Sequence, residues 1–227
     1  MTDPLRIRMV FHRAPVRAPD PILLVLVPGF DMRAEDFERH GFVDLARRHA
    51  PEANIILAEP DLDLYLDGAI GAQISALLRS EGGKHRRIWL AGISLGCFGA
   101  LLAVEHAAPI EGVLLLAPFL GTAGLIAEVG RAGGFAAWDP GAIEGDDHER
   151  RLLARLGGDL RQSEKGPILY LGFGRSDRFA AASRLLAAIL PPSRVFEIDG
   201  AHDWPSWERL WERILAAEPF APDPGRP

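Results

Sequence analysis

Residues 87–106 read RIWLAGISLGCFGALLAVEH, and this stretch decides the fold. Its beginning, RIWLAG (87–92), is short and apolar after the first residue, which is typical of a strand buried on both faces of a parallel sheet. The segment from Phe98 to His106 is apolar almost all round, which predicts a helix buried on most of its sides. Because this helix follows directly on the strand, we expect the two to form the centre of the fold.

Other strand-like runs flank this unit and alternate with helical patterns. Four of them are continuously apolar, as buried parallel strands are: ILLVLV (22–27), NIILA (54–58), GVLLLA (112–117) and PILYLG (167–172). LRIRMVF (5–11) alternates like a half-exposed edge strand, and RVFEID (194–199) closes the series. Apolar residues at helical spacing from Ile70 and after Pro205 predict amphipathic helices. The alternation predicts an α/β fold, a mostly parallel sheet of about seven strands with helices on both faces.

We expect one domain over residues 1–217, because 227 residues suffice for a single large core. From residue 119 to residue 165 the alternation of strands and helices lapses. A connection of that length is usually functional or a small cap, so we place a short cap insertion at about 119–165. The proline-rich last residues, 218–227, are expected to form a flexible tail.

The composition excludes a disordered chain, a membrane span and a nucleic-acid partner. Hydrophobic residues make up 48% of the chain and charged residues 25%, which is close to ordinary globular usage. The longest aliphatic run, Ile22 to Val27, is far shorter than the ~20 residues that cross a bilayer. With 25 Lys and Arg against 31 Asp and Glu, the net charge of -6 repels polyanions.

The expected location follows from the first residues and from the cysteine content. MTDPLRIRMVFHRAP (1–15) lacks the apolar stretch of a secretory signal. Cys97 is the only cysteine, which excludes an internal disulfide and is consistent with a reducing compartment. We therefore expect a cytoplasmic protein, with Cys97 as a small buried side chain.

The pentapeptide Gly92-Ile93-Ser94-Leu95-Gly96 has the pattern G-x-S-x-G and lies between the predicted strand and helix. A serine on such a sharp turn has strained backbone angles, and small residues two positions away on each side let the strand and the helix approach closely. This context predicts that Ser94 presents its hydroxyl as a nucleophile. The alternative is that Ser94 is an ordinary tight-turn residue.

A serine hydroxyl becomes a good nucleophile when an imidazole accepts its proton and a carboxylate orients that imidazole. Asp177 follows the strand PILYLG, and His202 follows the strand RVFEID. Parallel sheets place their sites at the carboxyl ends of the strands, so both side chains are candidates to meet Ser94. Each also has a structural alternative, since Asp177 could cap the next helix and His202 the helix at Pro205. We expect the neighbouring Asp203 to be a cap or salt-bridge residue.

The pentapeptide and the chain order Ser94, Asp177, His202 resemble those of the α/β-hydrolase family. The resemblance runs from LVLVPGF (24–30) to HDWPSW (202–207), nearly the whole chain, and is to a compact member similar to small carboxylesterases and thioesterases. It implies an α/β-hydrolase fold and a catalytic triad of those three residues.

The resemblance also implies an oxyanion hole formed by two backbone N–H groups, those of Leu95 and Phe30. Leu95 follows the nucleophile. Pro28-Gly29-Phe30 resembles the family's His-Gly-x turn, with proline in place of histidine, so the chain departs from the family at the second donor.

The implied activity is hydrolysis of a small-molecule carboxylic ester or thioester through an acyl-enzyme, without a cofactor or a metal. The acidic run at 146–149 is predicted to be a solvated loop, because consecutive residues do not easily converge on one ion. A peptidase, an acyltransferase, a carbon–carbon bond hydrolase and a non-catalytic ligand-binding relic remain alternatives on the same scaffold. In the predicted cap, Phe119, Leu120 and Trp138 either line the substrate pocket or pack the cap onto the sheet.

Overall fold

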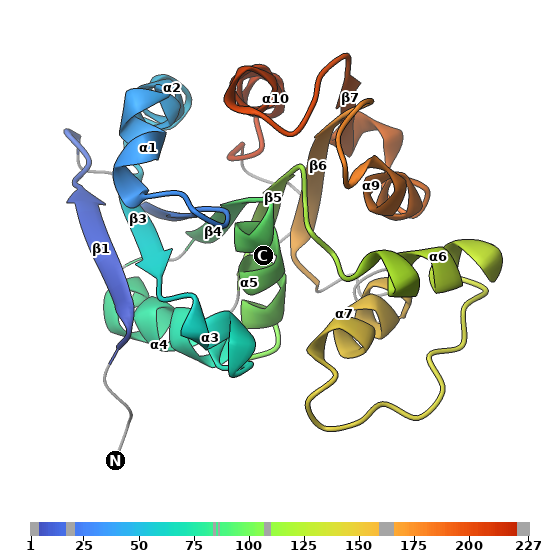
Figure 1. The fold of residues 1–227 in the computed structure, drawn as a ribbon. Helices are drawn as coiled ribbons and strands as arrows, with labels where there is room; N and C mark the ends of the chain where they lie inside the picture. The colour runs from blue at the N-terminus through green and yellow to red at the C-terminus, as the bar shows by residue number, and fades with distance from the viewer. Residues whose placement is uncertain are drawn as a thin grey trace.

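The computed structural model describes residues 5–16, 21–83, 85, 87–106, 110–158 and 166–221. These residues form a seven-stranded sheet in the order β1-β3-β2-β4-β5-β6-β7 (Figure 1). The strands are β1 (Ile7–His12), β2 (Ile22–Val27), β3 (Asn54–Pro60), β4 (Arg87–Ile93), β5 (Gly112–Leu116), β6 (Ile168–Gly174) and β7 (Val195–Ile198). Only β1, at the edge, pairs antiparallel, and the other described pairs are parallel. The predicted α/β fold is confirmed.

Helices cover both faces of the sheet. One face carries α1 (Ala34–Arg39), α2 (Phe42–His49) and α10 (Trp204–Ala216). The other carries α3 (Asp63–Leu66), α4 (Ile70–Gly82), α5 (Leu95–Ala103), α6 (Ala123–Arg131), α7 (His148–Gly157) and α9 (Ala180–Ala187). A short 3-10 helix, η1 (Pro192–Arg194), precedes β7. Among the described residues, no helix combines the length and the apolarity that a membrane crossing requires.

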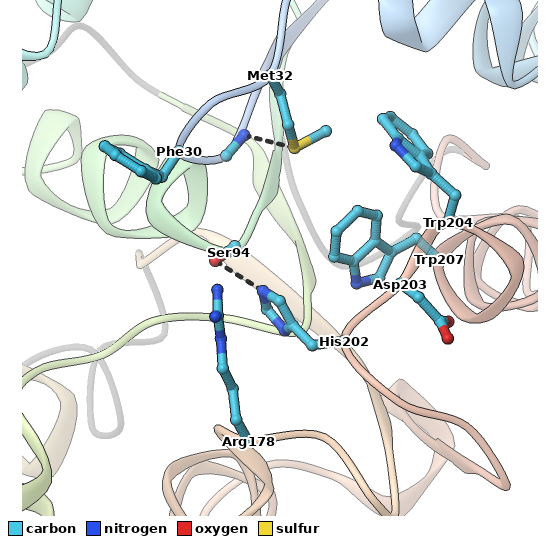
Figure 2. Close-up of a pocket in the computed structure, with 9 residues that line it drawn as sticks. Phe30, Met32, Ser94, Arg178, His202, Asp203, Trp204 and Trp207 are labelled. Carbon is cyan, nitrogen blue, oxygen red and sulfur yellow. Dashed lines mark hydrogen bonds between the residues drawn. The ribbon is translucent and has the colours of Figure 1, made fainter.

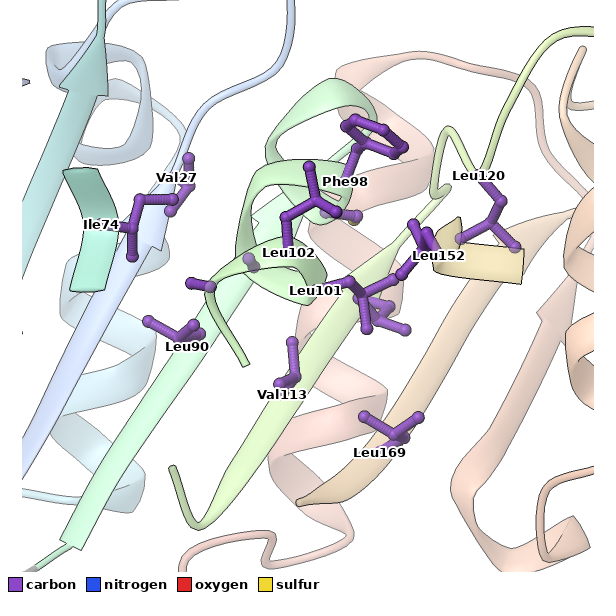
Figure 3. Close-up of a cluster of buried hydrophobic side chains, with 14 of the residues drawn as sticks. Val27, Ile74, Leu90, Phe98, Leu101, Leu102, Val113, Leu120, Leu152 and Leu169 are labelled. Atoms are coloured by element: carbon purple, nitrogen blue, oxygen red, sulfur yellow. The ribbon is translucent and has the colours of Figure 1, made fainter. Parts of the chain in front are cut away.

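The alternation of side chains along β2 divides the core into two clusters. Leu23, Val25 and Val27 face the cluster under α4 and α5, whereas Ile22, Leu24 and Leu26 face the cluster under α2 and α10. Figure 3 shows the first cluster, where side chains of β2, β4 and β5 meet those of α5. Each such side chain contributes about 1.5–3 kcal/mol on burial, which explains why the central strands are apolar on both faces.

The predicted cap region contains two helices, α6 and α7. Within 119–158, α6 and α7 are joined by residues 132–147, and residues 159–165 of the predicted cap lie outside the described residues. Arg150 of α7 donates to both carboxylate oxygens of Glu128 in α6, at 2.8 and 3.0 Å, which ties the two helices together. Residues 1–4 and 222–227, at the ends of the predicted domain and tail, also lie outside the described residues.

Candidate active site

Ser94 connects the end of β4 to the start of α5 in a strained backbone conformation. Its φ of 53° and ψ of -115° lie in a region that residues with a side chain rarely adopt. Such strain costs on the order of 1–3 kcal/mol and persists only where neighbours hold it. Here the Ser94 N–H donates to the carbonyl of Leu116 at 3.0 Å, and the Ser94 carbonyl accepts from Cys97 and Phe119, both at 3.1 Å.

The two glycines of the pentapeptide lie where no side chain fits. A Cβ added to Gly96 would lie 2.1 Å from the carbonyl oxygen of Val27 and 2.6 Å from that of Pro28. A Cβ on Gly92 would lie 2.5 Å from the backbone nitrogen of Cys97. The obstructing atoms belong to the backbone, so they cannot move aside as a flexible side chain would. The close approach of strand and helix that the sequence predicted is therefore present at both positions.

The Gly96→Ala substitution is expected to lower the free energy of unfolding by about 3 kcal/mol or more, because the new methyl group would overlap the backbone at the end of β2. Urea denaturation followed by circular dichroism measures the change. Gly124→Ala is the matched control, since Gly124 lies inside α6 with nothing within 4 Å of its added Cβ, and it is expected to stabilise by up to about 1 kcal/mol. Equal stability of Gly96→Ala and the wild type would contradict the steric argument.

The structure brings Ser94, Asp177 and His202 together. The Oγ of Ser94 lies 3.0 Å from Nε2 of His202, and Nδ1 of the same imidazole lies 2.8 Å from Oδ2 of Asp177 (Figure 2 shows the first contact). The side chain of Asp177 is fully buried. The geometry suits the tautomer in which Nδ1 donates to the carboxylate and Nε2 accepts from the serine hydroxyl.

The carboxylate of Asp177 contacts both the imidazole of His202 and the backbone that leads into α9. Its Oδ2 binds the imidazole, while its Oδ1 accepts the N–H of Phe179 at 2.7 Å, directly before α9 begins. The second bond holds the carboxylate in one orientation toward His202. The expectation for Asp203 is also met, because its side chain caps α10 by accepting the N–H of Ser206 at 3.0 Å.

The imidazole of His202 is held between two aromatic rings. The ring of Phe179 meets it edge to face, with centroids 5.0 Å apart and planes at 90°. Trp207 of α10 does the same at 5.1 Å and 87°. These contacts, together with the two hydrogen bonds of the ring, leave His202 one orientation. The arrangement can move a proton from the serine hydroxyl to the imidazole without a change of conformation.

The turn after β2 lies directly against the serine. A Cβ on Gly29 would lie 3.2 Å from Cβ of Ser94 and from the carbonyl oxygen of Ile93, so a side chain here would require these neighbours to shift by a few tenths of an ångström. The Gly29 N–H donates to Sδ of Met32 at 3.1 Å, which closes the turn around Phe30. Within the described ranges, the backbone N–H groups of Phe30 and Leu95 have no hydrogen-bond acceptor. Their assignment as oxyanion donors stays a prediction.

A cavity of about 370 Å³ opens at Ser94 and His202, within the usual size range for small-molecule sites. Figure 2 shows its walls, which come from the turn after β2, the loop after β6 and the start of α10. The lining residues are Gly29, Phe30, Met32, Ser94, Arg178, His202, Asp203, Trp204 and Trp207. The sequence analysis did not assign Met32, Arg178, Trp204 or Trp207 to the site. For two of them the sequence did hold a signal, namely their position next to a residue already considered: Arg178 follows Asp177, and Trp204 follows Asp203.

Phe119, Leu120 and Trp138 do not line this cavity, contrary to the pocket that the sequence suggested. Leu120 is fully buried in the core, where Figure 3 shows it near Leu152 of α7. Trp138 is 8% exposed, and its Nε1 donates to Glu128 at 2.9 Å. The reason is that both side chains belong to the buried apolar cluster that also contains residues of α5, α6, α7 and α9, so they point into the core. Leu120 and Trp138 therefore follow the alternative that the sequence left open, in which these side chains pack the cap onto the sheet.

Phe119 lies close to the candidate site but outside the cavity lining. Its ring lies between those of Phe98 and Phe179, with centroids 5.7 and 5.5 Å away, and Phe179 in turn contacts His202. Phe119 therefore supports the residues behind the imidazole without forming a wall of the cavity.

The thiol of Cys97 is unsuited to act as a second nucleophile. Cys97 is completely buried, and this burial raises its pKa well above the ordinary value for a thiol. Its Sγ donates to the carbonyl of Gly92 at 3.0 Å.

In the acidic run at 146–149, Asp147 caps α7 by accepting the N–H of Arg150 at 2.9 Å. The described residues contain no cluster of three His, Cys, Asp or Glu side chains placed to hold a metal ion.

By sequence, the chain matches no protein-family model and no curated protein. By structure, it is similar to S-formylglutathione hydrolase from Staphylococcus aureus, with 15% identity, a TM-score of 0.58 and coverage of 95% of this chain and 98% of the other. It is also similar to Est1E from Butyrivibrio proteoclasticus, with 18% identity, a TM-score of 0.63 and coverage of 97% of this chain and 94% of the other. A third similar structure is the fluorophosphonate-binding serine hydrolase F of Staphylococcus aureus, with 14% identity, a TM-score of 0.59 and coverage of 94% of this chain and 98% of the other. Together with the sheet order and the serine turn, these similarities identify the fold of this chain as that of the α/β-hydrolase superfamily.

Proposed function

We propose that the protein is a serine hydrolase that cleaves a carboxylic ester or thioester through an acyl-enzyme intermediate. The observation that carries the proposal is the hydrogen-bonded chain from Ser94 through His202 to the buried Asp177, with Ser94 and His202 lining a cavity of about 370 Å³. The structurally similar proteins support it, because their names include an S-formylglutathione hydrolase and a fluorophosphonate-binding serine hydrolase.

In the first half of the proposed reaction, Oγ of Ser94 attacks the carbonyl carbon while Nε2 of His202 takes the hydroxyl proton. The negative charge that develops on the carbonyl oxygen accepts hydrogen bonds from the N–H groups of Phe30 and Leu95. Each such donor contributes about 3 kcal/mol to lowering the barrier. Asp177 stabilises the imidazolium that forms. The intermediate collapses when the bond to the leaving alcohol or thiol breaks and His202 returns the proton to that group.

In the second half, a water molecule replaces the departed alcohol or thiol. His202 accepts a proton from this water as the oxygen attacks the acyl carbon, and the ester bond to Ser94 then breaks. The acid leaves and the serine regains its proton from the imidazole. The net reaction consumes one water and releases one acid and one alcohol or thiol, and these steps use only the side chains and amides named here.

A fluorophosphonate probe tests the proposal directly, because it forms a covalent bond only with an activated serine. We expect one adduct per folded chain, located on Ser94 by mass spectrometry of the peptides, together with hydrolysis of p-nitrophenyl butyrate. Protein unfolded in urea is the control and is expected to stay unlabelled. Folded protein that neither reacts with the probe nor hydrolyses the ester would indicate a ligand-binding relic. Faster cleavage of a peptide p-nitroanilide than of the ester would indicate a peptidase.

A further inference from the structure

Arg178 brings a positive charge to the cavity beside the candidate nucleophile. The residue follows Asp177 in the loop between β6 and α9 and lines the same cavity as Ser94 and His202. Figure 2 shows its side chain extending from the loop, with the guanidinium directed toward Ser94. Among the described residues that line this cavity, no other is a Lys or Arg.

The position of the Arg178 guanidinium is stabilised by a ring. Its Cζ lies over the ring of Phe179, 4.9 Å from the centroid. Phe179 is itself fixed, because its N–H binds Asp177 and its ring meets His202 edge to face. The guanidinium of Arg178 thus packs on Phe179, the residue that also contacts the imidazole of His202.

The charge of Arg178 is not neutralised by a carboxylate within the described part of the chain, where the structure gives its guanidinium no hydrogen bond or ion pair. Nearby, Arg175 of the same loop pairs with Asp199 at 2.5 Å. Asp203, the one acidic residue among the described residues that line the cavity, caps α10 instead. The guanidinium of Arg178 is therefore available to an anionic group that enters the cavity. Its planar set of N–H donors matches a carboxylate.

We propose that the substrate carries a carboxylate in addition to the ester or thioester, and that Arg178 binds this carboxylate while Ser94 attacks the acyl carbon. This inference rests on the proposed function and adds the substrate class. The cavity of about 370 Å³ holds a small molecule, and Phe30 and Trp204 offer apolar surface to the carbons between the two groups. A monoester of a short dicarboxylic acid has this composition. Because the chain has a net charge of -6, a local cation is needed to attract such an anion.

Two methyl esters of nearly equal size test this inference, with acid release followed at constant pH. Methyl hydrogen glutarate carries the carboxylate, and methyl pentanoate has a methyl group in its place. We expect the wild-type protein to prefer the glutarate. Arg178→Met is expected to lower kcat/KM for the glutarate by about 10- to 100-fold, mostly through KM, and to change kcat/KM for methyl pentanoate less than about threefold. Arg178→Lys is expected to restore part of the loss.

Arg175→Met is the matched control, since this arginine lies in the same loop but outside the cavity lining, and both esters should be hydrolysed as by the wild type. Equal kcat/KM of the wild type for the two esters, or a parallel loss on both in Arg178→Met, overturns the carboxylate inference. Labelling of Ser94 by the fluorophosphonate probe in that case leaves the proposed function intact. A wild type that is neither labelled nor active on either ester overturns both.

Discussion

The Ser94→Ala variant is expected to lose on the order of 10⁴-fold or more in kcat/KM on p-nitrophenyl butyrate and to give no fluorophosphonate adduct. Without Oγ there is no atom to form the acyl-enzyme, and the imidazole of His202 has no hydroxyl to deprotonate. The loss should lie in kcat, because the walls of the cavity remain. Steady-state kinetics on the purified variant measures it.

The fold should survive the Ser94→Ala substitution, since alanine keeps the Cβ and the backbone bonds that hold the strained turn. Circular dichroism and urea denaturation check this, with an expected change within about 1 kcal/mol. Ser183→Ala is the matched control: Ser183 is also buried, its Oγ has no hydrogen-bond partner among the described residues, and it lies in α9 outside the cavity lining. Retention of more than about 1% of wild-type activity by a pure, folded Ser94→Ala variant would remove Ser94 from the nucleophile role.

The Asp177→Asn variant is expected to lose about 10⁴-fold in kcat at neutral pH with little change in KM. Oδ1 of Asp177 accepts the N–H of Phe179, so an asparagine keeps that bond with its carbonyl oxygen. Its amide then faces Nδ1 of His202 as a donor, 2.8 Å away in the present geometry. Nδ1 must then accept, the proton moves to Nε2, and the imidazole can no longer take the serine proton.

Asp199→Asn is the control for this substitution, because Asp199 is exposed, pairs with Arg175 and does not line the cavity. Its activity is expected to equal that of the wild type. Nuclear magnetic resonance of the imidazole protons can report the tautomer directly, with the proton on Nδ1 in the wild type and on Nε2 in Asp177→Asn. An Asp177→Asn variant with unaltered kcat would show that the contact with His202 is structural only.

The parts of the fold that sequence predicted well are those set by local chemistry. The apolar runs that became β2, β4, β5 and β6 had to be buried on both faces, and their neighbours in the sheet are parallel strands as expected. The serine turn was predictable because only glycine fits at Gly92 and Gly96. The candidates Asp177 and His202 followed from one topological rule, that the carboxyl ends of parallel strands share an edge.

The conformation of residues 119–158 was less predictable. The apolar residues Leu120 and Trp138 have the same pattern whether they cover a substrate or pack on the sheet, and periodicity alone does not distinguish these surfaces. The outcome depends on where α6 and α7 pack, and their bonds through Glu128 and Arg150 join residues 22 positions apart.

The sequence by itself determined the order of strands and helices and the identity of the glycines at the serine turn, because steric fit and burial act over a few neighbouring residues. The tertiary structure alone decided that Met32, Arg178, Trp204 and Trp207 share one cavity with Ser94. They come from the turn after β2, the loop after β6 and the first turn of α10, which are far apart in the chain. Which way each side chain points depends on the local backbone conformation and on the residues packed beneath it. The apolar pattern of the chain does not encode those directions.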